Sequence, residues 1–179
     1  MAEQKAKKRS VGLVVLTDIP GMGVVAVLRR RGKINPEKDD FHESYPGGCQ
    51  VTCHGKVKPE DDKEDEALLR EAGEEIGQEA AHKLLVQNRG RLTVLVDDRE
   101  ANAVTFGIFM PDPDFIHLIR LEVSSGGLEL LPQSEIGNIR DLLRDFDKRT
   151  GVTDTNVIAM FPDEIKAVRL AFEILAPAS

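Results

Sequence analysis

The sequence has no tryptophan, a single tyrosine and few aromatic residues of any kind, which make up 4% of its 179 residues. Recognition of a nucleobase by aromatic stacking is therefore weakly supported by composition. Only two cysteines are present, Cys49 and Cys53, whereas small secreted domains held by disulfides carry more. No apolar run approaches the ~20 residues that cross a bilayer, and no signal-peptide pattern follows the polar, basic start. We expect a cytoplasmic protein with reduced thiols and no membrane partner.

The composition that is present is acidic and typical of a globular protein. Hydrophobic residues make up 41% and charged residues 31%, and the formal net charge is −7. Stable binding to nucleic acid is not expected, because such binding relies on lysine and arginine. An excess of carboxylates is compatible with a divalent cation. The length is typical of one domain.

The order of apolar patterns predicts a mixed α/β (α+β) domain. We predict a flexible tail over residues 1–9 and one domain over residues 10–179. Strands are predicted over residues 10–17, 24–28, 49–53, 91–96, 103–110 and 115–123. Helices are predicted over residues 65–76, 134–146 and 162–175, with Gly77 ending the first and Ser134 capping the second. In the last helix one apolar face is expected to pack on the core, made by Ile165, Val168, Phe172 and Leu175.

The first predicted helix carries three carboxylates on one side. At about 100° per residue, Glu74, Glu75 and Gln78 fall within roughly 60° of Glu71. A separate apolar stripe is formed by Leu69, Ala72 and Ile76. Like charges at this spacing cost an isolated helix a few tenths of a kcal/mol per pair, which a bound cation would offset. The alternative is an ordinary solvated acidic face, and the helical positions alone do not decide between a cation site and such a face.

Residues 70–77, Arg-Glu-Ala-Gly-Glu-Glu-Ile-Gly, resemble the core of the Nudix box of the Nudix hydrolase superfamily. That signature is Gly, five residues, Glu, seven residues, then Arg-Glu-U-x-Glu-Glu-x-Gly-U, where U is a bulky aliphatic residue. Counting back from Arg70 puts Asp62 at the first Glu position and leaves Gly55 one residue too early, which indicates a one-residue insertion. Gln78 stands in place of the final aliphatic residue.

The resemblance implies a Nudix α/β/α sandwich with a mixed sheet, and hydrolysis of a diphosphate bond in a nucleoside-diphosphate-linked substrate with Mg²⁺ or Mn²⁺. The implied metal ligands are Glu71, Glu74, Glu75 and the backbone carbonyl of Gly55. Glu71 is alternatively the base that activates water, and Arg70 is expected to orient a box glutamate. One further catalytic carboxylate is expected from a later segment, with Glu122 preferred over Glu129 and Glu135.

Four residues are candidates for substrate binding. Arg29, Arg30 and Arg31 follow a strand at a place where relatives contact phosphate, although a solvated basic strand end explains them equally well. Tyr45, beside the Pro-Gly-Gly turn, is a candidate for stacking on a base. The substrate stays open among nucleoside triphosphates, ADP-ribose, dinucleoside polyphosphates and coenzymes. A homodimer is compatible with the sequence.

Two alternative functions stay open. One is a catalytically silent Nudix domain that binds a nucleotide. The other is an enzyme like isopentenyl diphosphate isomerase, in which Cys53 would be an acid or base. A zinc site made by Cys49, Cys53 and His54 is weakly supported, since no second pair of ligands follows. Gly73, inside the predicted helix, suggests close approach of another backbone.

Overall fold

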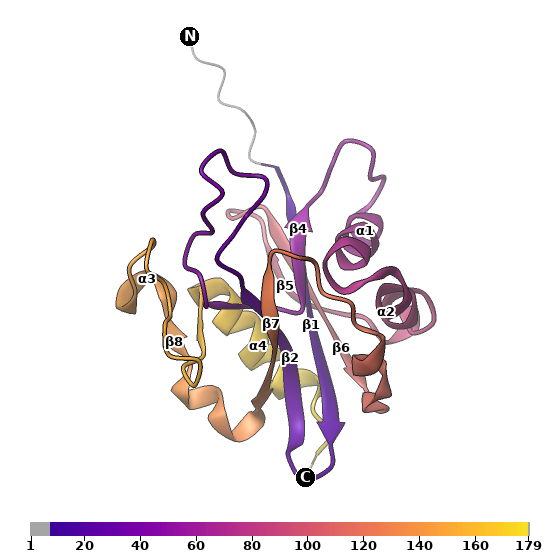
Figure 1. Cartoon of the computed structure of the whole chain (residues 1–179). Coiled ribbons are helices and arrows are strands. Elements are labelled where there is room, and N and C mark those ends of the chain that lie inside the picture. Colours follow the sequence, from indigo (N-terminus) through magenta and orange to yellow (C-terminus); the bar gives the residue numbers. More distant parts are fainter. Residues whose placement is uncertain (1–7, 179) are drawn as a thin grey trace.

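The computed structural model describes residues 8–178, and its framework is a mixed sheet of seven strands within that range (Figure 1). The order is β3-β2-β1-β6-β5, with β4 pairing with β1 and β7 pairing with β2. The strands are β1 (Ser10–Ile19), β2 (Gly23–Arg31), β3 (Cys49–Gln50), β4 (Cys53–Lys56), β5 (Thr93–Asp98), β6 (Ala103–Met110) and β7 (Ser125–Pro132). A separate short parallel pair is formed by β8 (Arg140–Asp141) and β9 (Ala159–Met160).

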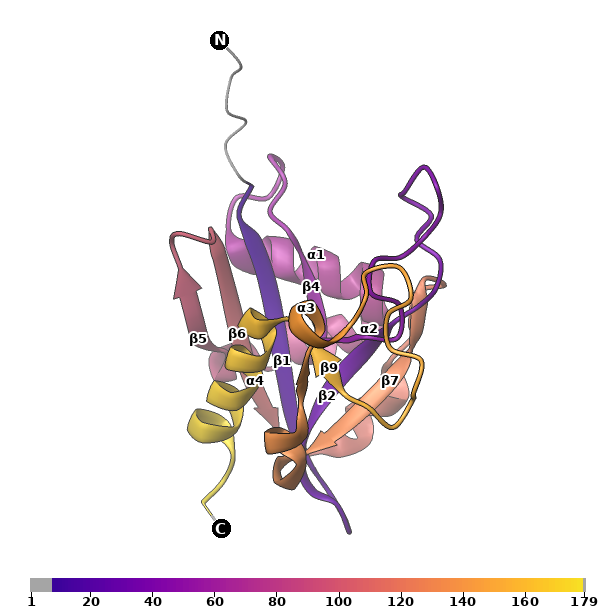
Figure 2. The ribbon, with the colours of Figure 1, turned by 90° about the vertical axis from the view of Figure 1, so that its left-hand side faces the viewer.

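Helices cover both faces of the sheet. The α-helices are α1 (Glu64–Ile76), α2 (Gln78–Ala81), α3 (Leu142–Asp145) and α4 (Pro162–Leu175). Shorter turns are a π-helix at His82–Val86 and 3-10 helices at Arg89–Arg91, Pro113–Leu118 and Gln133–Asn138. Figure 2 shows α4 on one side of the sheet and α1 on the other. The α/β/α sandwich expected from the sequence is therefore confirmed.

Alternation along β1 explains why two layers form. Leu13 and Val15 belong to the core beneath α1, whereas Val14 and Leu16 belong to the core beneath α4. Successive side chains of a strand point to opposite faces, so a strand that is apolar at every position needs cover on both. The central strand β1 is therefore fixed between the two helical layers.

The predictions for the first hairpin, the end of the first helix and the last helix are confirmed. β1 and β2 pair antiparallel around residues 19–23. α1 ends at Ile76, and Gly77 has φ +92°, a value that favours glycine, although its ψ of 148° is not that of a left-handed helical cap. In α4, Val168 and Phe172 are buried, and Ile165 and Leu175 pack beside them.

The strand predicted over residues 115–123 is wrong. Pro113–Leu118 is a 3-10 helix, which begins because the side chain of Asp112 accepts a hydrogen bond from the backbone N–H of Asp114. Its apolar residues, with Phe115 buried, pack into the core under α1 rather than alternating on a sheet. The strand that pairs with β2 is instead β7, which lies in a segment without a clear pattern.

The helix predicted over residues 134–146 is also wrong. A 3-10 helix, β8 and the single turn of α3 occupy this stretch. Asp141 caps α3, because its side chain accepts from the N–H groups of Leu143 and Arg144, and Ser134 caps nothing. Gly137 and Asn138 lie where a continuous helix would have to pass, and both residue types favour ends of helices.

The single strand predicted over residues 49–53 is two short strands. β3 pairs with β2, whereas β4 pairs with β1. Between them the Thr52 hydroxyl donates to the Val27 carbonyl at 2.6 Å and accepts from the Val15 N–H at 3.0 Å. The Thr52 side chain therefore connects β1 and β2 at the point where the chain passes from β3 to β4.

The predicted tail lies mostly outside the described residues, which begin at Lys8. Arg9 is held by ion pairs with Glu64 at 2.8 Å and Asp97 at 2.9 Å. No helix within residues 8–178 has the length and apolar character that a bilayer crossing needs.

Candidate functional site

A cavity of about 680 Å³ lies where β2 and β4 end beside α1. Glu71, Glu74 and Glu75 all line it, together with Gly55 and Glu122. The structure therefore brings the three helix carboxylates and the preferred later carboxylate to one space. The neighbouring cationic residues that line it are Arg29, Arg30, Arg31, Lys56 and Lys58.

Arg70 links the loop before α1 to the first helix carboxylate. Its Nε and Nη2 donate to the two carboxylate oxygens of Asp61 at 3.2 and 2.8 Å, and its Nη1 donates to Glu71 at 2.7 Å. Hydrogen bonds from Arg70 hold the pKa of Asp61 below its usual value. A fork of this kind fixes orientation as well as charge. Glu71 is thus held in place by the residue predicted to orient it.

This contact corrects the alignment of the box, because Asp61 and not Asp62 pairs with Arg70. Asp62 is exposed, and its backbone N–H donates to Glu66. Five residues separate Gly55 from Asp61, as in the family signature. The extra residue therefore lies between Asp61 and Arg70, where the loop enters α1.

Gly55 is required by a close approach. A Cβ atom at this position would lie 1.9 Å from the carboxyl carbon of Glu71. Any other residue would push that carboxylate away from the backbone of β4. The glycine therefore allows Glu71 to rest against the backbone that carries the predicted carbonyl ligand.

Glu75 and Glu71 are both enclosed, with 12% and 13% of their side chains exposed, compared with 52% for Glu74. The Oε1 of Glu75 pairs with Arg29, and its Oε2 accepts from the backbone N–H of His54 at 2.8 Å. Burial raises the pKa of Glu75 to about 7, although Arg29 and this hydrogen bond act in the opposite direction. Glu75 is thus a buried carboxylate whose charged form is favoured by Arg29 but disfavoured by its burial.

Glu122 reaches the cavity because the loop that carries it closes the end of α1. The N–H of Arg120 donates to the carbonyl of Ile76 at 2.8 Å, and the N–H of Glu122 donates to that of Glu75 at 3.3 Å. These bonds satisfy carbonyls that a helix end leaves unpaired. The Glu122 carboxylate then accepts from Arg29 at 2.6 Å.

The rival carboxylates lie elsewhere. Glu129 pairs with Arg30 at 2.7 Å, and Glu135 is exposed, accepting from Asn138. Neither lines the cavity. Of the three later candidates, only Glu122 shares the space with the helix carboxylates.

The three consecutive arginines have different surroundings. Arg29, with 5% of its side chain exposed, contacts Glu75 and Glu122. Arg30 donates to Glu129 and to three backbone carbonyls, those of Gly47, Thr155 and Val157. Arg31 donates to the Ser44 carbonyl and to Glu43, and lies over the Phe161 ring. Arg29 therefore faces the carboxylates, whereas Arg30 and Arg31 hold neighbouring loops.

Solved structures share this architecture at low sequence identity. The NUDIX domain of Shewanella oneidensis NrtR, complexed with ADP ribose, matches with a TM-score of 0.58 over 96% of this chain and 90% of that chain, at 14% identity. A NUDIX hydrolase from Alicyclobacillus acidocaldarius matches with a TM-score of 0.52, over 94% of this chain and 92% of that chain, at 16% identity. The chain has the Nudix fold.

Another match of this kind is the C-terminal domain of mouse MUTYH, solved with human PCNA. Its TM-score is 0.53 at 13% identity, over 97% of this chain and 95% of that chain. No protein-family model matches the sequence, and no curated protein matches it either. At these identities the likeness is one of fold.

A divalent cation, typical of the Nudix fold, suits the donor chemistry of the cavity, because its acidic lining offers carboxylate oxygens. The close seat of Glu71 on Gly55 also fits a ligand set that includes the backbone there. Within residues 8–178, however, no three His, Cys, Asp or Glu side chains are gathered as a metal cluster. The reason is visible in the contacts: Glu71 is turned to Arg70 and Glu75 to Arg29.

Tyr45 does not line this cavity, and the predicted stacking role is not supported. Its ring packs edge-on against Phe161, with ring centroids 5.4 Å apart. Its N–H donates to the Lys148 carbonyl, and its φ is +53°. Tyr45 therefore packs with Leu142 and Val152 in a small separate core.

The two cysteines lie in different layers of the Nudix sandwich. Cys53 is buried in the core under α1 and Cys49 in the core under α4, so they cannot share a zinc ion. Burial raises the pKa of Cys49 to about 12 and that of Cys53 well above its usual value. Because Cys53 is buried outside the cavity lining, an isomerase that uses it as acid or base is not supported.

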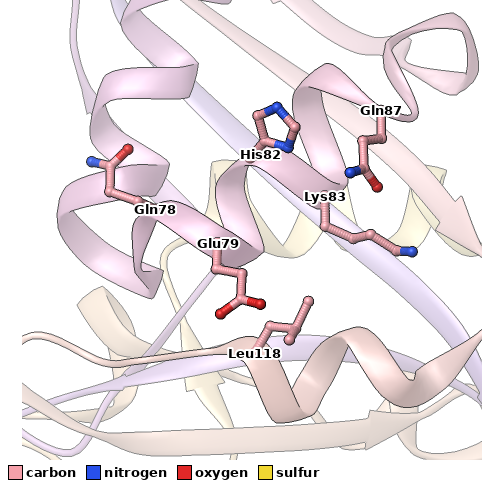
Figure 3. Close-up of a pocket in the computed structure, with 6 residues that line it drawn as sticks. All are labelled: Gln78, Glu79, His82, Lys83, Gln87 and Leu118. Atoms are coloured by element: carbon pink, nitrogen blue, oxygen red, sulfur yellow. The ribbon is translucent and has the colours of Figure 1, made fainter.

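The glycine inside α1 meets a side chain rather than another backbone, which corrects the expectation for Gly73. A Cβ atom there would lie 2.3 Å from the amide nitrogen of Gln78, the residue at the last position of the box. Gln78 also borders a second hollow of about 560 Å³, between the α2 region and Leu118 (Figure 3). The other residues lining that hollow are Glu79, His82, Lys83 and Gln87.

Sequence reasoning missed Asp61, which holds Arg70 beside the main cavity and could have been found from its spacing to Gly55. It also missed several residues that line the cavity. Lys56 ends the short strand β4 and Lys58 follows it, and neither carries a signal of its own. Gln50 and His54 enter because β3 and β4 pair with different partners, which the sequence does not indicate.

Proposed function

We propose that the chain hydrolyses a diphosphate bond in a nucleoside-diphosphate-linked substrate, with Mg²⁺ or Mn²⁺ as cofactor. The observation that carries this proposal is the meeting of Glu71, Glu74 and Glu75 with Glu122 in one cavity. Three come from a single helix and the fourth from a loop bonded to the end of that helix. Such a set suits a reaction in which negative charge on phosphate oxygens must be neutralised.

The residues have distinct roles in this proposal. Glu71, Glu74, Glu75 and the Gly55 carbonyl would hold the cation, which would supply charge neutralisation at the diphosphate and activation of water. Arg70 keeps Glu71 in place through its own pair with Asp61. Glu122 accepts the proton when water forms the new P–O bond and the bridging P–O bond breaks. Its side chain is 37% exposed, so it can exchange that proton with solvent.

The substrate class follows from the charges around the cavity. Lys56 and Lys58 line it and are well placed to attract an anionic group. Their side chains stand outside the tight ion pairs that occupy Arg29, Arg30 and Arg31, although Lys58 lies 4.0 Å from Glu74. The ADP ribose bound by the Shewanella NUDIX domain supports a nucleotide-like ligand for this chain as well.

A second function, nucleotide binding without turnover, is favoured by one observation. The carboxylates of Glu71 and Glu75 are paired with arginines rather than gathered around one point. If these pairs persist when ligand binds, the cavity would hold a nucleotide without activating water.

The test is hydrolysis of a substrate panel by wild type, Glu74→Gln and Glu75→Gln with Mg²⁺ or Mn²⁺. The panel holds ADP-ribose, nucleoside triphosphates, a dinucleoside tetraphosphate and coenzyme A. Glu79→Gln, which removes a glutamate outside the cavity, is the matched control. We expect turnover by wild type and by Glu79→Gln, and its loss in the other two variants.

Other outcomes decide between the functions. Equal turnover by all four proteins would contradict a metal-holding role for Glu74 and Glu75. Tight nucleotide binding with no turnover by wild type would favour the binding domain. Cys53→Ala is expected to hydrolyse like wild type, whereas an isomerase acting on isopentenyl diphosphate would lose its activity with this change.

A further inference from the structure

The cavity already contains a cation of its own, the guanidinium of Arg29. It lies between Glu75 of α1 and Glu122 of the following loop, with one terminal nitrogen donating to each. Its Nη2 also reaches Gln50 at 3.4 Å. The Arg29–Glu75 pair is shielded from water, with 5% and 12% of the two side chains exposed, whereas Glu122 is 37% exposed. Arg29 therefore ties together two carboxylates that the proposed reaction needs.

The same contacts compete with a second cation. One oxygen of Glu75 faces Arg29, and the other accepts from the His54 N–H. A divalent ion at Glu75 must share an oxygen with Arg29 or displace it, and a positive charge nearby lowers its affinity. Glu122 offers its Oε1 to the same arginine. The contacts of Arg29 thus lower the affinity of the cavity for a metal ion in the absence of substrate.

One atom of Arg29 remains unsatisfied. Its Nε is buried and has no hydrogen-bond partner among residues 8–178. A buried donor without a partner costs about 1–3 kcal/mol. A rearrangement that gives Arg29 additional acceptors is favoured by this cost. The oxygens of a diphosphate are such acceptors, and the planar fork of arginine matches them.

We propose that Arg29 couples cation binding to diphosphate binding. Without substrate, Arg29 occupies Glu75 and Glu122. A diphosphate draws the guanidinium to its own oxygens, which frees Glu75 for the divalent ion and Glu122 to accept a proton. Cation and substrate then bind cooperatively, and each strengthens the other by the same factor. The inference rests on the metal site of the proposed function but not on turnover.

The neighbouring arginines do not share this property. Arg30 is fixed by Glu129 and three carbonyls, and Arg31 by Glu43 and the Ser44 carbonyl. Neither contacts Glu75 or Glu122. Arg31 nevertheless lines the same cavity and has 14% of its side chain exposed. Arg31→Met is therefore a control that removes one positive charge from the cavity without touching the two carboxylates.

The experiment measures Mn²⁺ affinity by electron paramagnetic resonance, with and without α,β-methylene ADP-ribose, a diphosphate diester that cannot be hydrolysed. The proteins are wild type, Arg29→Met, Arg29→Lys and Arg31→Met, and Mn²⁺ binding by the analogue itself is measured without protein. For wild type we expect the analogue to raise Mn²⁺ affinity about 10-fold or more, within the usual range of coupling between sites. Arg29→Met should bind Mn²⁺ alone about 10-fold more tightly and show little further gain.

The remaining proteins separate the interpretations. Arg29→Lys keeps the positive charge, so its Mn²⁺ affinity without analogue should stay near that of wild type. This variant also provides a comparison if Arg29→Met folds poorly. Arg31→Met should show the wild-type coupling. Weaker Mn²⁺ binding by Arg29→Met, or coupling equal to that of wild type, would overturn the inference and leave the proposed function standing. An absence of Mn²⁺ binding by all four proteins would overturn both.

Discussion

Glu75 and Glu164 lie in opposite layers of the same sandwich, and burial raises the pKa of each to about 7. Their partners differ. Glu75 lines the open cavity and pairs with Arg29, and a backbone N–H holds its second oxygen. Glu164 is closed beneath the first turn of α4, where one oxygen accepts from the Val51 N–H at 3.2 Å and the other has no partner among residues 8–178. The same shift in pKa therefore accompanies a reachable carboxylate in one case and an enclosed one in the other.

The position of Glu164 indicates a structural role. It is the third residue of α4, and its hydrogen bond from the Val51 N–H joins the start of that helix to the segment after β3. A perturbed pKa alone would mark both glutamates as functional candidates, and the contacts separate them.

The largest effect expected from this comparison is on turnover. Glu75→Gln should reduce diphosphate hydrolysis with Mg²⁺ about 1000-fold, because it removes a charge that holds the cation. Glu164→Gln should leave kcat/KM within about threefold of wild type. Steady-state assays of the two variants, with folding checked by circular dichroism, test this. A similar loss in both would show that the two layers are not functionally separate.

A similar contrast separates Arg29 from Arg30 in β2, and it concerns the stability of the folded protein. Arg30→Met should lower the free energy of unfolding by about 4 kcal/mol, since it removes the partner of Glu129 and the donors to three carbonyls. Arg29→Met should cost less, because Glu75 and Glu122 line the open cavity and gain access to water. Urea denaturation measures both, and an equal cost would contradict the division of roles.

The parts of the fold that follow repeating patterns were predictable from the sequence. The hairpin of β1 and β2 and the amphipathic α4 have strong local periodicity, and the box gave α1 with its three carboxylates. β7 was missed because most of its residues have intermediate burial and it begins Ser-Gly-Gly, so no alternation marks it. Residues 115–118 were predicted as a strand because apolar residues close together fit either structure until Asp112 is seen to cap a turn.

The candidate site likewise has contacts that the sequence predicts and contacts that it does not. Contacts within α1 and the loop before it depend on spacing, so Arg70 and the three glutamates could be named from the sequence, whereas Asp62 was named in place of Asp61. Contacts between distant segments depend on the topology. The pairing of Arg29 with Glu122 joins residues 93 positions apart, and the separation of Arg29 from Arg30 depends on which face of β2 each occupies. Neither this pairing nor this separation leaves a pattern in the local sequence.

The pH dependence of stability sharpens the comparison further. The pKa of Glu164 is about 7 in the folded state and near 4.5 when unfolded. Because the folded value is the higher one, its contribution is fully present below pH 4.5 and is lost as pH rises through 7. From pH 4.5 to pH 8 the loss reaches about 3 kcal/mol.

Unfolding free energies at several pH values, for wild type and Glu164→Gln, isolate this term, since Glu75 titrates in both proteins. The charged and titratable groups around Glu164 include Asp163, Arg31, His54, Asp98 and Lys166, and all are retained in the variant. We expect the difference between the two curves to shift by about 3 kcal/mol in favour of Glu164→Gln as pH rises. A constant difference would mean that Glu164 keeps the same charge throughout.

The smallest expected effect concerns Gly55, where the cavity depends on a missing side chain rather than on a charge. Gly55→Ala places a Cβ atom against the Glu71 carboxylate, which must then move off the backbone of β4. A displacement of this kind should lower kcat/KM about 10-fold, equivalent to about 1.4 kcal/mol, with little change in stability. Gly90→Ala is the matched control, because a Cβ atom there meets nothing within 4 Å. Equal activity of the two alanine variants would show that Glu71 does not need its contact with Gly55, and the role of the Gly55 carbonyl as a ligand would lose its structural support.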